Sequence, residues 1–261
     1  PPLSGTADAF YKQMLSLCLK GYRIVSVTYP QYFSLADFVT GFSQFLTSIG
    51  VEDVHLMGAT LGAFLALAFA ESKPQRVASL VLCGGFHSTE FFSQNMPCPP
   101  GLLRYMPEFY LKRLVLANYP KDNIRDPAIV ESIDFMVQQL EALDQEHVAS
   151  RLTLNCTNAK VDLRKLKVPP SKVTLIETMD EHVLPSALSD HLRDALQGCK
   201  VAHIRKGGNF PFLAAHEDFT LHLEVHLRTI GGLRATALET AKPAEGAKKE
   251  ATIEQPRGSV A

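Results

Sequence analysis

VHLMGATLGAFLALAFA, residues 54–70, is the stretch of the chain that says most about its fold. Its first five residues form a short apolar run of the kind that builds a buried β-strand. Residues 61–70 are apolar on almost every side, as expected for a helix buried against a sheet. Gly58 and Gly62 flank the junction between the two segments. The stretch therefore predicts a strand, a sharp turn and a buried helix in direct succession.

The segments on either side of this unit repeat the alternation of strand and helix. Residues 22–29 (YRIVSVTY) are rich in β-branched and aromatic residues, which is typical of a buried strand. The expected strands are residues 22–29, 54–58, 76–83, 172–177 and 200–205, and the expected helices are residues 7–19, 35–49, 61–70, 186–196 and 217–230. Such alternation predicts an α/β fold, with a mostly parallel central sheet flanked by helices on both faces.

Residues 87–160 interrupt this alternation, because they contain no run of comparable strand character. Helical patterns occur at 108–117 and 128–143, and Asp126-Pro127 favours a helix start before the second. These features predict a helical, lid-like insertion within one α/β domain that spans residues 1–232. Residues 233–261 consist mainly of Ala, Lys, Glu, Thr and Pro, and they are predicted to form a disordered C-terminal tail.

Composition limits the classes of function. The chain has 261 residues, of which 46% are hydrophobic, and this suits one sizeable globular domain. Its 26 basic and 27 acidic residues nearly cancel, so the charge balance does not favour nucleic acid or an anionic membrane as a partner. Five scattered cysteines without a C-x-x-C pair indicate reduced thiols in a cytoplasmic protein. The sequence has no metal-ligand cluster and no phosphate-binding glycine loop, so no cofactor or metal is expected. It also has no apolar run long enough to span a membrane.

Gly58-Ala59-Thr60-Leu61-Gly62 matches the Gly-x-Ser-x-Gly pattern of a nucleophile elbow, with Thr60 at the nucleophile position. In such an elbow, the amide of the next residue, here Leu61, helps to hold an oxyanion. The first six residues are expected to supply the second oxyanion amide, and Leu3 is their first donor because proline has no amide hydrogen. A β-branched residue suits a strained turn poorly, which argues against efficient catalysis by Thr60. The alternatives are a plain turn at the start and glycines that serve packing alone.

The acid and base positions of a catalytic triad follow the last two predicted strands. Asp180 and Glu181 both qualify as the acid that orients a histidine, and spacing alone does not choose between them. The histidine itself is expected in Lys206-Gly207-Gly208-Asn209-Phe210-Pro211, where Asn209 takes its place. A carboxamide is not basic near neutral pH and cannot accept the Thr60 proton, so the triad is predicted to be degenerate. The histidines that could act as a rewired base are His182, His203 and His216.

Five segments of the chain resemble the maspardin family, a branch of the α/β-hydrolase superfamily. They are residues 4–8 (SGTAD), 54–59 (VHLMGA), 133–137 (IDFMV), 149–156 (ASRLTLNC) and 206–211 (KGGNFP), within a resemblance that covers residues 3–230. The resemblance implies an α/β-hydrolase fold in which Asn209 is characteristic of the family. It also implies that serine is usual where this chain has Thr60, so the elbow departs from the family pattern.

The same resemblance implies a function in protein binding. It implies a non-catalytic adaptor that binds the cytoplasmic tail of the T-cell helper co-receptor and negatively regulates it. An aldehyde dehydrogenase family member is implied as a second partner, and peripheral association with endosomal and trans-Golgi membranes is implied for a cytoplasmic protein. The alternatives are a weak or atypical serine-type hydrolase of a small ester or lipid, and a receptor that binds a small ligand without turnover.

The topology of the superfamily implies one more strand, formed by residues before Pro1 and placed between the strands expected at 22–29 and 54–58. Without it, main-chain groups on both sides would be buried without partners, each at a cost of about 1–3 kcal/mol. The sequence is therefore expected to be a fragment of a longer gene product that lacks its N-terminal strands. A cooperative melting transition equal to that of a longer chain would contradict this expectation.

Overall fold

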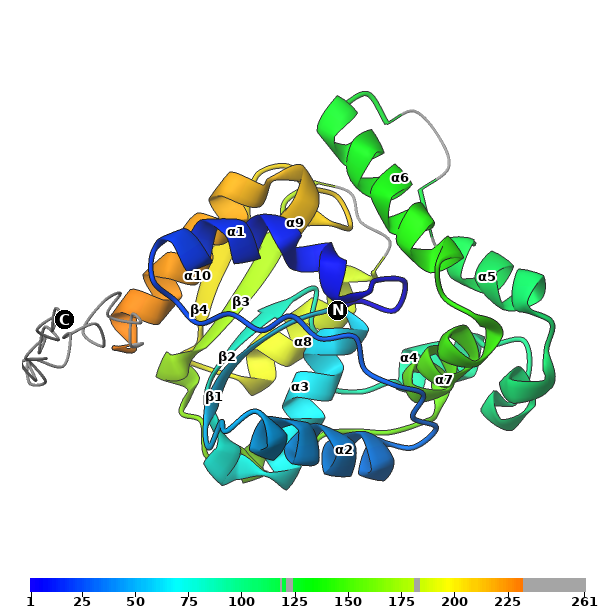
Figure 1. Ribbon diagram of the computed structural model, residues 1–261, viewed down its shortest axis with the longest axis horizontal. Helices are drawn as coiled ribbons and strands as arrows, with labels where there is room; N and C mark the ends of the chain where they lie inside the picture. Colours follow the sequence, from blue (N-terminus) through cyan, green and yellow to red (C-terminus); the bar gives the residue numbers. More distant parts are fainter. Residues whose placement is uncertain (118, 121–123, 181–183, 232–261) are drawn as a thin grey trace, which may run out of the picture.

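Four parallel strands form the centre of the structure, a computed structural model that describes residues 1–117, 119–120, 124–180 and 184–231. They are β1 (Val54–Ala59), β2 (Val77–Cys83), β3 (Val173–Thr178) and β4 (Lys200–Ile204), and they lie side by side in the order β1-β2-β3-β4 (Figure 1). Parallel neighbours need crossover connections, and helices supply them here. The predicted α/β fold with its parallel sheet is confirmed.

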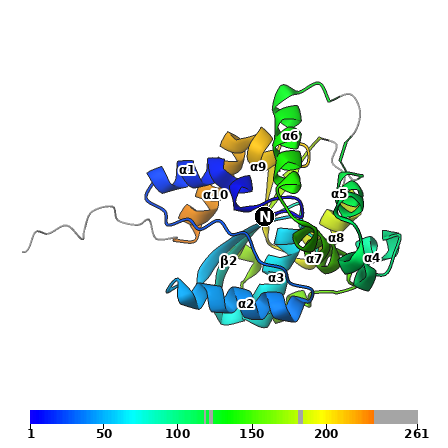
Figure 2. The same ribbon diagram turned by 45° about the vertical axis from the view of Figure 1, so that its right-hand side comes forward.

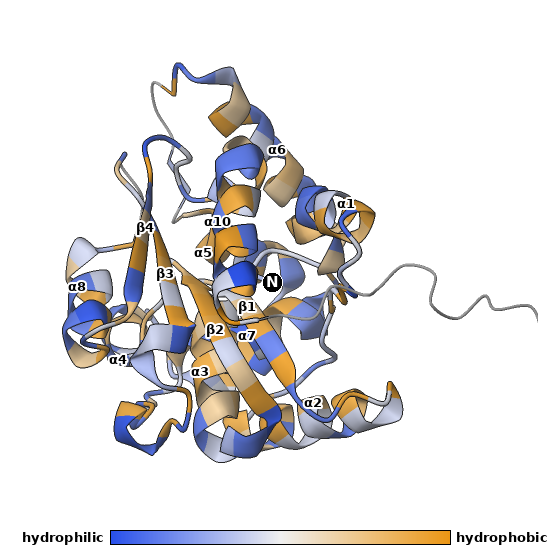
Figure 3. Cartoon of the chain, turned by 90° about the vertical axis from the view of Figure 1, so that its left-hand side faces the viewer, coloured by the Kyte–Doolittle hydropathy of each residue, from blue (hydrophilic) through white to orange (hydrophobic). Residues whose placement is uncertain are grey.

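Helices cover both faces of this sheet (Figures 1 and 3). The face of α3 also carries α2 and α8, and the opposite face carries α1, α9 and α10. The bounds of these helices are α1 (Tyr11–Leu19), α2 (Leu35–Ser48), α3 (Leu61–Ser72), α8 (Ser186–Ala195), α9 (Pro211–Ala214) and α10 (His216–Thr229), with short 3₁₀ helices at η1 (Ala7–Phe10), η2 (Pro74–Arg76), η4 (Leu163–Lys165) and η5 (Pro170–Lys172). Nine residues of α3 are buried, which explains why its sequence is apolar all round.

The insertion between β2 and β3 is built from helices alone among the residues that the structure describes there, apart from one isolated bridge between Ser88 and Lys160. Its elements are α4 (Glu90–Asn95), η3 (Pro100–Tyr105), α5 (Glu108–Leu116), α6 (Pro127–Glu141) and α7 (Gln145–Cys156). They enclose a separate apolar core around Leu103, Leu111 and Leu140. Figure 2 shows α4, α5, α6 and α7 gathered on one side of the domain. The side chain of Asp126 accepts a hydrogen bond from the Ala128 amide and so caps α6.

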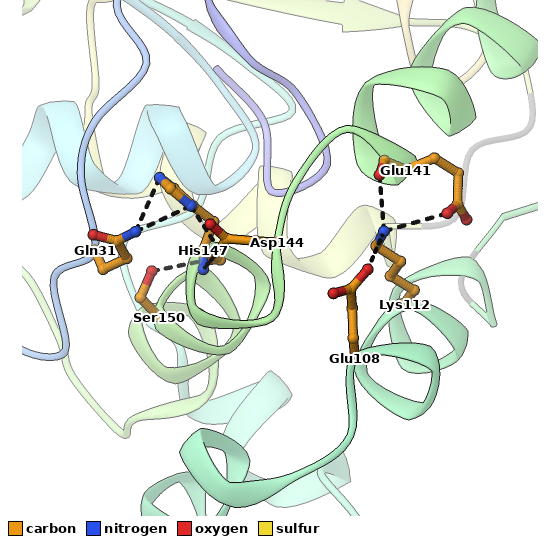
Figure 4. Close-up of polar contacts among 7 residues, drawn as sticks. All are labelled: Gln31, Glu108, Lys112, Glu141, Asp144, His147 and Ser150. Carbon is orange, nitrogen blue, oxygen red and sulfur yellow. Dashed lines mark hydrogen bonds and ion pairs between the residues drawn. The ribbon is translucent and has the colours of Figure 1, made fainter.

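Two polar contacts fix the insertion (Figure 4). Lys112 of α5 is nearly buried, and its ammonium group lies 2.9 Å from the carbonyl oxygen and 3.2 Å from a carboxylate oxygen of Glu141, at the end of α6. His147 of α7 lies 2.8 Å from the Asp144 carboxylate and 3.1 Å from the Gln31 side chain. The first contact joins α5 to α6, and the second joins α7 to the segment that leads into α2.

Residues 22–29 do not form the predicted strand. Within the described part of the chain, β1 pairs with β2 alone, and residues 22–29 run past β1 without a hydrogen-bonded ladder (Figure 1). A groove of about 540 Å³, lined mainly by apolar side chains, separates the two segments. Strands pair only at a spacing of about 4.8 Å, so this segment is instead held by side chains. Thr28 accepts from the Ala7 amide at 2.7 Å, and Ser26 donates to the Ala7 carbonyl at 2.5 Å. The expectation of a further strand beside β1 stays a prediction.

The predicted C-terminal tail at 233–261 lies outside the described residues. Within the described ranges, no helix is long and apolar enough to cross a bilayer.

A buried histidine links side chains from three strands on the α10 face of the sheet. His226 of α10 lies 2.7 Å from the Thr174 hydroxyl of β3 and 2.9 Å from the Ser79 hydroxyl of β2. The Ser79 hydroxyl also lies 2.9 Å from His55 of β1. Burial lowers the pKa of His226 to about 4, and nearby positive charges act in the same direction. The folded protein therefore holds this imidazole neutral.

We expect His226 to make the protein less stable as the pH falls from 6.5 towards 4. The pKa is about 4 in the folded protein and about 6.5 in the unfolded chain, so only the unfolded chain gains a proton over most of this range. The neutral imidazole contributes fully above pH 6.5, and at pH 5 the loss is about 2 kcal/mol of unfolding free energy. His226→Gln keeps hydrogen-bonding groups but does not titrate. Urea unfolding at pH 7.5 and pH 5 should show a smaller acid loss in the variant, and equal losses would contradict this assignment.

Candidate functional site

Thr60 lies in the turn between β1 and α3 and has a strained backbone. Its φ is 49° and its ψ is −112°, and it is the one non-glycine residue with positive φ among those that the structure describes. Its amide donates to the Cys83 carbonyl at the end of β2, at 2.9 Å. Such a conformation costs about 1–3 kcal/mol and persists only where the surroundings enforce it. The turn therefore has the backbone of a nucleophile elbow, with a threonine at its centre.

The two glycines of the turn allow a close approach of main chains on both sides of it. A Cβ atom on Gly58 would lie 2.3 Å from the carbonyl oxygen of Gly62, at the first turn of α3. A Cβ atom on Gly62 would lie 2.5 Å from the carbonyl oxygen of Pro1. The first glycine therefore lets β1 and α3 meet, and the second lets the first loop of the chain lie against the start of α3.

Arg151 of α7 anchors the first loop of the chain at residues 3–5. Its side chain is fully buried, and Nη1 donates to the carbonyl oxygens of Leu3 at 3.0 Å and Gly5 at 2.5 Å. The guanidinium lies over the ring of Tyr29, 5.0 Å from its centre. Leu3 lines the same pocket as Thr60, and the Leu61 amide begins α3 beside it. Their role as oxyanion donors stays a prediction.

The acid loop and the base loop are joined through Asp180. The Asp180 carboxylate accepts from the Gly207 amide at 2.8 Å and from the Gly208 amide at 2.9 Å. Asn209 is the next residue after Gly208, and it lines the pocket together with Thr60. The structure thus places Asp180 against the loop of the expected base, whereas Glu181 and His182 lie outside the described residues.

His203 is the one histidine among the described residues that line this pocket. It lies on β4, half-exposed, with Nδ1 3.9 Å from the Glu177 carboxylate. Three strand spacings, about 14 Å, separate β4 from β1, so His203 is far from hydrogen-bonding reach of Thr60. His216 begins α10 and is not among the lining residues. The structure therefore brings neither histidine into position as a base for Thr60.

The Asp144–His147 pair of the insertion does not form a second catalytic group. Ser150 lies nearby, but its hydroxyl donates to the main-chain carbonyl oxygen of His147 at 2.9 Å (Figure 4). A nucleophile must donate to the imidazole for general-base activation. These three residues therefore cap and brace α7.

The pocket beside Thr60 has a volume of about 760 Å³. It lies between the ends of β1 to β4 and the insertion, and Phe210 forms part of its wall while Phe212 packs in the core below. Burial raises the pKa of Cys83 to about 12 and that of Cys156 to about 11, so both lining thiols are neutral near pH 7. Burial also raises the pKa of Tyr119 to about 12, although its hydrogen bond to Ser4 acts in the opposite direction. These three groups offer neither a thiolate nor a base.

A metal centre finds no support in the geometry. The described residues contain no group of three or more His, Cys, Asp or Glu side chains arranged to hold an ion.

Comparison with known proteins identifies the class to which this fold and elbow belong. Residues 3–220 match the model of the alpha/beta hydrolase family, and the chain belongs to that family. It is a maspardin-like member: the protein named maspardin from Danio rerio is 41% identical over 240 residues, covering 91% of this chain and 76% of that protein. Maspardin from Homo sapiens is 39% identical over 241 residues, with 92% and 77% covered.

Solved structures agree on the fold. A thermophilic esterase from Thermogutta terrifontis superimposes with a TM-score of 0.66 at 15% identity, covering 86% of each chain. An enol-lactonase from Burkholderia xenovorans LB400 gives 0.65 at 15% identity, covering 87% of this chain and 88% of that one.

Proposed function

We propose that this protein is a non-catalytic adaptor, which uses an α/β-hydrolase scaffold to bind protein partners. The observation that carries the proposal is Asn209, in the loop that Asp180 holds at the pocket of Thr60. Hydrolysis by an elbow hydroxyl needs a base that accepts its proton, and a carboxamide cannot do so. With Thr60 also in place of the usual serine, two of the three triad positions carry unsuitable side chains.

Similarity to maspardin supports the proposal of specific partners. We propose the cytoplasmic tail of the T-cell helper co-receptor, which the protein would negatively regulate, and an aldehyde dehydrogenase family member. The proposed location is the cytoplasm, with peripheral association at endosomal and trans-Golgi membranes. The insertion offers a surface for such partners, since Leu102, Tyr105 and Phe109 are exposed by 52%, 82% and 72%. Exposed apolar side chains that are grouped within one short segment are typical of docking sites.

A weak serine-type hydrolase of a small ester or lipid is the second candidate. The observation that favours it is the strained backbone of Thr60, because strain in a nucleophile elbow serves to expose the reacting hydroxyl.

Labelling with a fluorophosphonate separates the two functions. We expect no labelling of the natural protein or of Thr60→Ser, because both carry Asn209 at the position of the base. Thr60→Ser/Asn209→His should gain labelling by about 100-fold or more, the usual contribution of a positioned general base. Mass spectrometry of the labelled peptide identifies the residue that reacts.

Binding of a co-receptor tail peptide to the same proteins tests the adaptor side. We expect equal affinities for the natural protein and the double variant, and a loss of binding in Tyr105→Ser/Phe109→Ser. In the labelling experiment, the control for triad chemistry is Asp180→Asn added to Thr60→Ser/Asn209→His, because it should remove the gain in labelling. Labelling of the natural protein at Thr60 would establish the hydrolase instead.

A further inference from the structure

The pocket beside Thr60 has the size and the walls of a small-molecule site. Its volume of about 760 Å³ falls within the range of 300–1,000 Å³ that is usual for such sites. Apolar side chains from the insertion and from the loop after β3 form most of the wall, with Phe92, Leu152 and Leu184 among them. Since Phe212 packs elsewhere, the apolar space is open to a ligand.

Three charged side chains occupy one part of this wall. Arg193 of α8 lies 2.8 Å from a carboxylate oxygen of Glu177 and 3.2 Å from one of Asp190. The side chains of Arg193 and Asp190 are 41% and 52% exposed, which places them at the rim, whereas that of Glu177 is 14% exposed. One cation thus faces two anions, and these are the charged lining residues among those described, apart from His203. Glu177, Asp190 and Arg193 together carry a net charge of −1.

This arrangement disfavours an anionic ligand. Arg193 would be the natural partner of a carboxylate, but Glu177 already binds it through both oxygens, at 3.0 and 2.8 Å. A carboxylate that entered would approach two like charges, and the one cation of the cluster is already paired with both of them. The remaining polar groups of the wall are uncharged, such as the hydroxyls of Thr60 and Tyr119 and the Asn155 carboxamide. They suit a neutral polar group.

We infer that this pocket binds a neutral, largely apolar molecule, and that the cluster of Glu177, Asp190 and Arg193 excludes the anionic counterpart of the same ligand. Binding does not depend on the proposed adaptor function, whereas persistence of the ligand without cleavage rests on it. The charge cluster therefore determines which charge on a ligand this site accepts.

Two fluorescent probes that differ only in charge test the inference. They are dansylaminoundecanoic acid and its primary amide, which share the chain and the fluorophore. Titration of the protein at pH 7.5 should give at least about tenfold tighter binding of the amide. An amide is also a poor substrate, so the measurement stays independent of any hydrolase activity. Equal affinities, or no binding of the amide at micromolar concentration, would overturn the inference.

Variants of the cluster provide the sharper comparison. In Glu177→Gln/Asp190→Asn, Arg193 is no longer neutralised, and the preference should reverse in favour of the acid. Glu217→Gln/Asp218→Asn is the matched control, because it removes two carboxylates from exposed positions at the start of α10 that do not line the pocket. A preference that changes equally in this control would show that net charge acts at a distance and would contradict the assigned cluster.

A pocket-filling variant locates the probe. Leu184→Trp should abolish binding of both probes, because the larger ring occupies the apolar space. Leu221→Trp places the same ring on the exposed face of α10, where Leu221 is 54% exposed, and should leave binding intact. Melting curves of both variants confirm that they fold. Unchanged binding in Leu184→Trp would show that the probe occupies another site, whereas fluorophosphonate labelling of a protein that still binds the amide would contradict the adaptor function alone.

Discussion

Gly58→Ala is expected to lower the free energy of unfolding by about 3 kcal/mol or more. The added methyl group would lie 2.3 Å from the carbonyl oxygen and 2.4 Å from the carbonyl carbon of Gly62, and 2.6 Å from the amide nitrogen of Ala63. All three are main-chain atoms at the start of a buried helix, so no side chain can rotate away. Relief requires α3 to move off β1, which would open the core that these two elements share.

Urea unfolding of the purified variant measures this effect. Gly101→Ala is the matched control, because a Cβ atom there has no heavy atom within 4 Å and the residue does not have positive φ. We expect the control to change the free energy of unfolding by less than about 0.5 kcal/mol. A Gly58→Ala protein that unfolds at the same urea concentration as the control would show that β1 and α3 are not in such close contact.

Arg151→Ala is expected to destabilise the protein by about 3–5 kcal/mol. The guanidinium is fully buried and donates to the carbonyl oxygens of Leu3 and Gly5, so its loss leaves two buried acceptors without this donor. It also leaves a void beneath the ring of Tyr29. The loop of residues 3–5 then loses its attachment to α7, and the wall of the pocket beside Thr60 loosens with it.

Hydrogen exchange distinguishes this local effect from general destabilisation. The substitution Arg151→Ala should raise the exchange rate of amides in the loop of residues 3–5 more than that of amides in β2, at the centre of the sheet. Arg164→Ala serves as the control, because Arg164 is 90% exposed and pairs with Asp162 at the surface. Stability and exchange equal to those of the control would contradict the bracing role of Arg151.

Most of the fold could be predicted from hydrophobic periodicity, and two of the differences have physical causes. The strand expected at 22–29 has the composition of a buried segment, but within it only Tyr22 and Tyr29 are buried, and composition does not report whether a hydrogen-bonded neighbour is present. Helix α7 has no apolar stripe to detect, because all residues from Val148 to Cys156 are buried, with Ser150, Arg151 and Asn155 among them. A helix that is buried on every side and polar in part gives no amphipathic signal.

The site was predictable only where its residues are close together in the sequence. The elbow stands out because two glycines and a hydroxyl occupy five consecutive positions between a strand and a helix. Arg151 was missed, since its acceptors on Leu3 and Gly5 lie 148 and 146 residues away and a lone arginine in a helix usually faces water. The hydrogen bonds from two glycine amides to Asp180 also required the loop conformation, because amides carry no sequence signature.

The attachment of Asp180 to main-chain amides has a consequence for how this family can evolve. Because Gly207 and Gly208 hold the carboxylate through their backbones, the side chain at position 209 contributes nothing to those particular bonds. A substitution at position 209 can therefore change the chemistry that the pocket supports while these main-chain hydrogen bonds between the two loops stay in place.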